Sequence, residues 1–125
     1  MAYALKTIRE DGTTRNWFKW PDKGPIEEIS NIDPANNGPC PGRLGDGICL
    51  GKTFFGMAQG GIPARHILTI RYRQKDVLGE DSEKLRVRSC IVLKRYTIKE
   101  YLRNKKDADL QGANLQGADL QGAIR

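Results

Sequence analysis

A five-residue repeat at the C-terminus constrains this chain more than any other feature of its sequence. Residues 108–112, 113–117 and 118–122 are three copies of one pattern, and Ala123 and Ile124 begin a fourth. Each copy runs alanine, aspartate or asparagine, leucine, glutamine, glycine. An amphipathic helix repeats at about 3.6 residues and a strand at about 2, so a period of five fits neither. The tail is therefore predicted to form a repeat structure distinct from both.

The repeat resembles the pentapeptide-repeat family, in which a central leucine or phenylalanine follows a small residue by two positions. The central residues here are Leu110, Leu115 and Leu120, and the small residues that the resemblance turns inward are Ala108, Ala113, Ala118 and Ala123. The resemblance implies about one coil of right-handed β-helix over residues 105–125, with these side chains along its axis. Members of the family that mimic DNA are acidic, whereas this tail is nearly neutral, so DNA mimicry is not expected.

One coil cannot cover its own top and bottom, because repeat structures gain stability by stacking neighbouring units. Three outcomes stay open for the tail. It docks on the preceding domain, it stacks against another chain to form a homo-oligomer, or it is the short form of a longer repeat. The remaining interpretation is a frayed tail, since repeats rich in glutamine and glycine tolerate disorder.

Residues 1–104 are predicted to form one small α+β domain with a central antiparallel sheet. The 125 residues of the chain allow one modest core. Residues 66–73 and 85–95 alternate apolar and basic side chains, which predicts a central pair of strands joined by a hairpin loop at 74–84. Further elements are expected as strands at 2–8 and 48–55, a short strand or turn at 26–29, and a short helix at 97–103, where Thr97 and Glu100 have the spacing of a capping box.

The positive charge of the chain gathers in one segment. The net charge is +6, and residues 65–106 carry thirteen Lys/Arg against five Asp/Glu, whereas residues 1–64 carry seven of each. If the apolar faces of the two alternating stretches share one core, four arginines project together from the other face. They are Arg71, Arg73, Arg86 and Arg88. The planar guanidinium suits phosphate, so this face is predicted to hold an anionic partner, either a nucleotide-like small molecule or a nucleic acid.

Three further residues are candidates for contacting that ligand. Trp17 and Trp20 are interpreted as core residues, with a stacking platform for a base as the alternative. Lys52 lies in Gly51-Lys52-Thr53, which ends as a phosphate-binding P-loop ends. The glycine that such a loop needs five positions earlier is Asp46, so the segment is interpreted as a glycine-rich turn leading into a strand.

Several short stretches together resemble small uncharacterised domains of phage and bacterial proteins that precede pentapeptide-like repeats. They are residues 3–6, 11–13, 18–21, Cys40, 45–48 and the late stretch 86–94. The resemblance implies a phage or bacterial setting, in which such a domain would sequester a host signalling nucleotide. Cys49 stands where their pattern has histidine. The Gly-x-Gly segment also resembles the central strand of ADP-ribosyltransferase-like folds, which makes a degenerate domain of that kind a second alternative. Their late glutamate pair is missing, because Glu100 stands alone.

No enzymatic activity and no cofactor are expected. The serines have no plausible catalytic triad, and a Cys49–His66 nucleophile and base would rest on sequence proximity alone. Cys40, Cys49 and His66 are an incomplete ligand set for zinc, so no metal is expected. The odd cysteine count and the lack of a secretory signal predict reduced thiols in the cytoplasm. No apolar run approaches the roughly 20 residues of a membrane span.

Two classes of function follow. The first is a non-enzymatic binding module that holds an anionic nucleotide-like ligand on the basic sheet face. The alternative is an interaction or inhibitor protein that oligomerises through its repeat tail.

Overall fold

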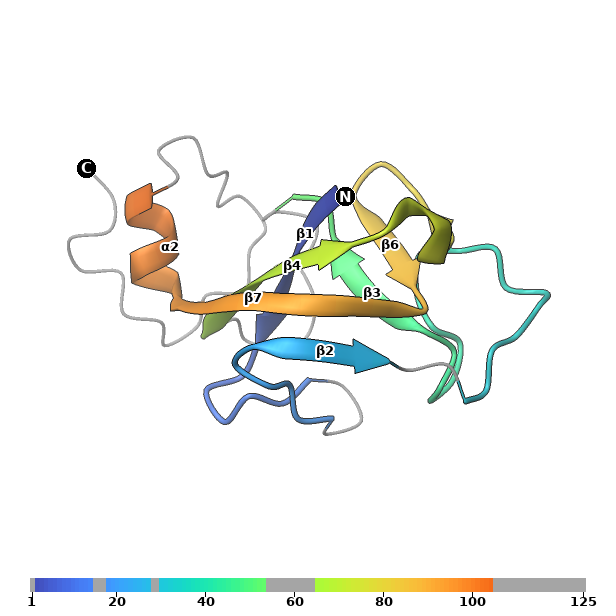
Figure 1. The fold of residues 1–125 in the computed structure, drawn as a ribbon, viewed down its shortest axis with the longest axis horizontal. Coiled ribbons are helices and arrows are strands. Elements are labelled where there is room, and N and C mark those ends of the chain that lie inside the picture. The colour runs from blue at the N-terminus through green and yellow to red at the C-terminus, as the bar shows by residue number, and fades with distance from the viewer. Residues whose placement is uncertain (1, 15–17, 28–29, 54–64, 105–125) are drawn as a thin grey trace.

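The computed structural model describes residues 2–14, 18–27, 30–53 and 65–104. Within these residues the strands form one open, seven-stranded antiparallel sheet in the order β2-β7-β4-β1-β3-β6-β5 (Figure 1). The strands are β1 (Ala2–Ile8), β2 (Gly24–Glu27), β3 (Ile48–Gly51), β4 (His66–Tyr72), β5 (Val77–Glu80), β6 (Lys84–Val87) and β7 (Ser89–Thr97). A 3-10 turn η2 (Gln74–Asp76) precedes β5, and helix α2 (Ile98–Asn104) follows β7.

The predicted α+β class is wrong, because the regular secondary structure of the described residues is almost entirely sheet. Their α-helix content is the seven-residue α2 at the end of β7. The stretch 74–84, expected to be a hairpin loop, contains β5, which pairs with β6 through Val77↔Val87 and Glu80↔Leu85. A charged, glycine-containing segment becomes a strand here because a neighbouring strand offers it a ladder, not because of its own alternation.

The stretch 85–95 is two strands rather than one. The backbone N–H of Arg88 donates to the carbonyl of Asp76 at 2.9 Å, and Arg88 belongs to neither β6 nor β7. β4 then pairs with β7, from His66↔Thr97 to Arg71↔Ile91, while β6 pairs with β3 and β5. The break also shifts the alternation, so Val92 is fully buried, whereas uninterrupted alternation from Leu85 and Val87 would have buried Ile91.

One face of the sheet carries the main hydrophobic core. Its members come from five of the strands and from the segment before β2. They are Ala4, Ile8, Trp20, Ile48, Leu50, Leu68, Ile70, Tyr72, Leu85, Val87, Cys90 and Val92. The indole Nε1 of Trp20 donates to Thr14 Oγ1 at 3.1 Å, and Phe18 packs edge-on against the ring. The core interpretation of Trp20 is therefore confirmed, while Trp17 lies outside the described residues.

The short helix expected at 97–103 is confirmed as α2. The N–H of Thr97 donates to Glu100 Oε1 at 2.9 Å, and the N–H of Glu100 donates to Thr97 Oγ1 at 3.1 Å. This is the reciprocal capping box that the spacing predicts. Ile98 and Tyr101 of α2 are buried, and the helix contacts β4 and β7. Residues 105–125, where the coil of repeats is expected, lie outside the described part of the chain.

Candidate functional site

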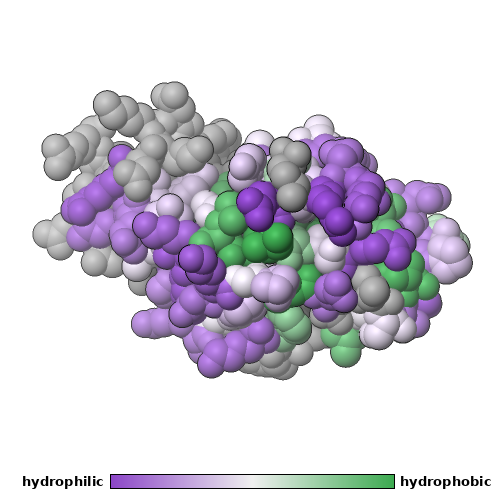
Figure 2. Space-filling model, viewed as in Figure 1, coloured by the Kyte–Doolittle hydropathy of each residue, from purple (hydrophilic) through white to green (hydrophobic). Residues whose placement is uncertain are grey.

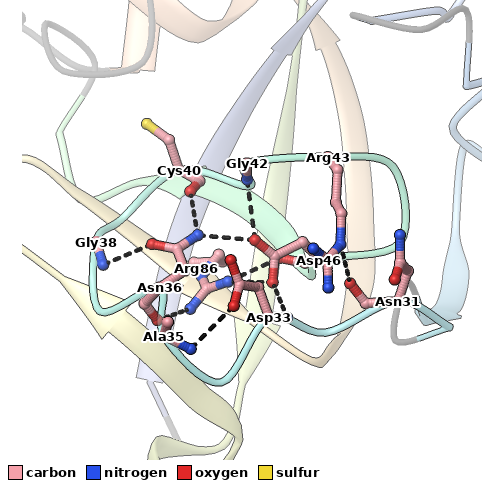
Figure 3. A network of polar contacts seen from close by, with 10 residues as sticks. All are labelled: Asn31, Asp33, Ala35, Asn36, Gly38, Cys40, Gly42, Arg43, Asp46 and Arg86. Carbon is pink, nitrogen blue, oxygen red and sulfur yellow. Dashed lines mark hydrogen bonds and ion pairs between the residues drawn. The ribbon is translucent and has the colours of Figure 1, made fainter.

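The loop that connects β2 to β3 folds around a buried ion pair. Asp46, near the end of this loop, meets Arg86 on β6, and the exposed fractions of the two side chains are 0% and 1% (Figure 3). Nη1 of Arg86 donates to Asp46 Oδ1 and to the Asp46 carbonyl, and Nη2 donates to the Asn36 carbonyl at 2.7 Å. The guanidinium therefore fixes two points of the loop to the sheet.

The Asp46 carboxylate is saturated with donors. Oδ1 accepts the N–H of Asp33 at 2.9 Å in addition to Arg86, and Oδ2 accepts Asn36 Nδ2 at 2.7 Å and the N–H of Gly42 at 2.9 Å. Burial alone raises the pKa of this carboxyl. The backbone donors, the Asn36 amide and the Arg86 charge outweigh burial and hold the pKa well below its usual value. Asp46 is therefore ionised inside the protein at neutral pH.

Glycines give the loop its path to Asp46. Gly45 and Gly47 both have φ of +88°, a conformation that residues with a side chain rarely adopt. A Cβ on Gly47 would lie 2.8 Å from Leu78 Cδ1 and 3.0 Å from Arg86 Cγ. The segment thus enters β3 as a glycine-rich turn, as predicted, with a buried acid where a P-loop has glycine.

The four arginines are not gathered into one patch. Arg71 and Arg86 lie on the same face of the sheet, the one opposite the core. Their strands, β4 and β6, are separated by β1 and β3, so at the usual strand spacing they lie roughly 14 Å apart. The Arg86 guanidinium is fully committed to the loop, apart from Nε, which has no hydrogen-bond partner among the described residues. Arg73 pairs with Asp76 at 3.0 Å, and Arg88 is exposed.

The structure also shows where the other residues predicted to contact an anionic ligand lie. Lys52 pairs with Glu80 at 2.6 Å at the surface, and the Trp20 ring is buried in the core. Arg71 shares its face with the cross-strand neighbours Tyr3 and Ile91, and its Nε is buried without a partner in the described structure. Seen in Figure 2, a small apolar area lies over the middle of β4 and β7 with hydrophilic side chains around it. Anion binding by the arginines, Lys52 and the tryptophans stays a prediction.

Sequence similarity concerns the tail. Residues 106–124 match the family described as Pentapeptide repeats (8 copies). Repeats of this kind are commonly protein–protein interaction modules. No curated protein and no solved structure matches the chain significantly, so the resemblance of the N-terminal domain to small phage domains is not supported. The coil and its inward leucines and alanines lie outside the described residues and stay predictions.

Sequence reasoning missed a half-buried amine in the domain that precedes the repeat tail. Nζ of Lys6 donates to the Cys49 carbonyl at 2.8 Å and lies 5.6 Å from the centre of the Trp20 ring. β1 and β3 share one register pair, Leu5↔Gly51, so the amine supplies the donor that the ladder no longer provides. Burial lowers the pKa of Lys6, and the Cys49 thiol partly offsets this. A lysine in an alternating strand carries no signal that would have predicted its burial.

The described residues hold neither a cluster of metal ligands nor a helix that could span a membrane. In residues 2–14, 18–27, 30–53 and 65–104, no three His, Cys, Asp or Glu side chains come together as ligands for an ion. The α-helix of the same residues is too short to cross a membrane.

Proposed function

We propose that this protein is a non-enzymatic protein–protein interaction module that assembles with itself through its pentapeptide-repeat tail. The observation that carries the proposal is the match of residues 106–124 to the pentapeptide-repeat family. A coil as short as this one leaves both ends uncovered, and a second copy offers the same leucines and alanines in the same geometry. Stacking two identical coils buries apolar side chains of both chains at once.

The distribution of charge along the chain adds a second, weaker contribution. Residues 65–106 carry an excess of eight positive charges, and residues 107–125 carry three acidic residues against one basic residue. The tail of one chain is therefore attracted to the domain of another.

The alternative function, an anionic nucleotide-like ligand held on the basic face, has less support. Two of its four arginines are already engaged, because Arg86 is buried against Asp46 and Arg73 pairs with Asp76. Arg71 and Arg88 leave a weaker basis for recognising phosphate than the four-residue patch predicted from sequence. A ligand of this kind would bind through charge, and its affinity would fall steeply with added salt.

Light scattering on the eluting peak of a size-exclusion column tests the proposal. The full chain is expected to elute as a dimer or larger species at micromolar concentration, and Leu115→Asp is expected to shift it to the mass of one chain. Gln116→Asp is the matched control, because it adds the same charge to the same repeat and leaves the central leucine in place. A full chain with the mass of one protomer at every concentration would overturn self-assembly, as would an unchanged mass for Leu115→Asp.

A further inference from the structure

The outer edge of β7 is only partly paired. β2 pairs with residues 89–92 of β7, from Glu27↔Ser89 to Gly24↔Val92, while β7 runs on to Thr97. Gly24 has φ of +115°, which turns the chain away from β7 at this point. Figure 1 shows β2 along one part of β7, with the part that leads to α2 lacking a strand on that side. Among the described residues, no strand pairs with residues 93–97 at this edge.

The hydrogen bonds around Thr97 show which backbone groups face outward. The N–H of Ile98 donates to the Arg65 carbonyl on the β4 side, while the N–H of Thr97 turns to Glu100. Backbone groups alternate in direction along a strand, so the N–H and C=O of Tyr96 face β4 and those of Arg95 face the open edge. An added strand can therefore exchange two hydrogen bonds with Arg95. Thr97 is closed to it by the helix cap.

An open cleft of about 490 Å³ runs along this edge, and its charge is unbalanced. The acids at its margin are engaged, because Asp22 pairs with Arg95 at 2.8 Å and Glu100 caps α2. Lys23 and Lys94 have no ion pair among the described residues, and Nζ of Lys94 lies 4.8 Å from the centre of the Tyr96 ring. The unbalanced charge of the cleft is positive, and an apolar side chain, Leu93, lies on its wall.

We propose that this edge of β7 binds a short, extended, acidic segment of a partner protein as an added strand, with Arg95 as the backbone contact and Lys23 and Lys94 as the charge contacts. Main-chain bonds supply part of the affinity in such β-augmentation, and the flanking side chains select the sequence. Exposed strand edges invite pairing unless they are blocked. The inference deepens the interaction role proposed above, but it concerns the domain and not the tail.

Nuclear magnetic resonance on the full chain tests the proposal with a defined probe. The acidic peptide Ac-EVTVEVT-NH2 at millimolar concentration is expected to shift the amides of residues 93–97. It should also slow hydrogen exchange at the outward Arg95 amide, whereas the Tyr96 amide is protected with or without the peptide. The charge-reversed peptide Ac-KVTVKVT-NH2 is expected to bind at least tenfold more weakly. Lys94→Glu should weaken the acidic peptide about tenfold, and Lys75→Glu, the same change in the distant turn η2, should not.

Several outcomes would overturn the inference. If the acidic peptide causes no shifts, the edge does not accept it. If both peptides bind with the same affinity, or if Lys94→Glu binds the acidic peptide as tightly as the unchanged chain does, charge does not select the peptide. If the Arg95 amide is protected in the free chain and released by Leu115→Asp at constant mass, the tail of the same chain occupies the edge. If its protection rises with chain concentration, a second copy does. The peptide titrations do not depend on whether the full chain elutes as an oligomer, so the two proposals fail separately.

Discussion

Replacing Asp46 with asparagine should destabilise the domain more than any change of equal size at its surface. The carboxylate accepts four side-chain and backbone donors, two on each oxygen, and the amide has one oxygen. If that oxygen keeps its hydrogen bonds from Arg86 and from the N–H of Asp33, the new NH2 group faces the N–H donors of Asn36 and Gly42 and can accept neither hydrogen bond. The Arg86 charge then also stays buried without a counter-charge.

The expected cost follows from these losses. Breaking a buried ion pair by removing one partner costs about 3–5 kcal/mol, and two lost hydrogen bonds to a charged group give a similar sum. For a domain of about 100 residues, each kcal/mol lowers the melting temperature by about 4 °C, so Asp46→Asn should lower it by about 12–20 °C. Urea unfolding followed by tryptophan fluorescence measures the same loss, because Trp20 lies in the core.

A second pair of side chains supplies the control. Lys52 and Glu80 form an ion pair of similar length with 31% and 41% of their side chains exposed, so Glu80→Gln should cost less than about 1 kcal/mol. Asp46→Asn combined with Arg86→Met should cost less than the sum of the two single changes, by about 1–3 kcal/mol, because the partners are in contact. An Asp46→Asn cost as small as that of Glu80→Gln would refute the role given to the buried pair.

Three other outcomes are expected. Gly79→Ala should destabilise the domain by about 1–3 kcal/mol in urea unfolding. The reason is that the new Cβ would lie 2.3 Å from the Gly38 carbonyl oxygen and push the loop away from β5. A change below about 0.5 kcal/mol would show that the loop moves freely. Asp46 has a lowered pKa in the folded state, so its contribution should be present above about pH 4 and lost as the pH falls through the folded pKa, and acid unfolding of Asp46→Asn should lack this component. Burial raises the pKa of Cys90 to about 12, so a thiol reagent at pH 8 should label the exposed Cys40 first, and equal rates would contradict the burial of Cys90.

Local signals in the sequence predicted several elements correctly. The strand at residues 2–8 follows from its alternation, and α2 follows from the Thr97 and Glu100 capping box. The strand expected at 48–55 is correct over Ile48–Gly51 (β3), but Lys52 and Thr53 lie beyond it, and β4 was expected because apolar and basic residues alternate. Each of these signals lies within ten residues of the element that it predicts, so no knowledge of the partner strand was needed.

The rest depends on contacts between distant residues. The single backbone bond from Arg88 to Asp76 divides one predicted strand into β6 and β7 and reverses which side chains enter the core. Arg86 was correctly placed on the face opposite the core. The sequence did not reveal that the loop ending at Asp46, forty residues earlier, covers that face and buries the guanidinium. A prediction of solvent exposure from alternation fails wherever a long loop folds over the polar face.

Sedimentation equilibrium of the full chain and of residues 1–104, measured side by side, tests the central claim most directly. That claim is that the sheet domain folds by itself and that assembly belongs to the repeat tail. We predict that residues 1–104 sediment as one folded chain, with the far-ultraviolet spectrum of a β protein, while the full chain sediments as a dimer or a larger species. If both proteins sedimented as oligomers with the same number of chains, the claim would be contradicted, because association would then reside in the domain.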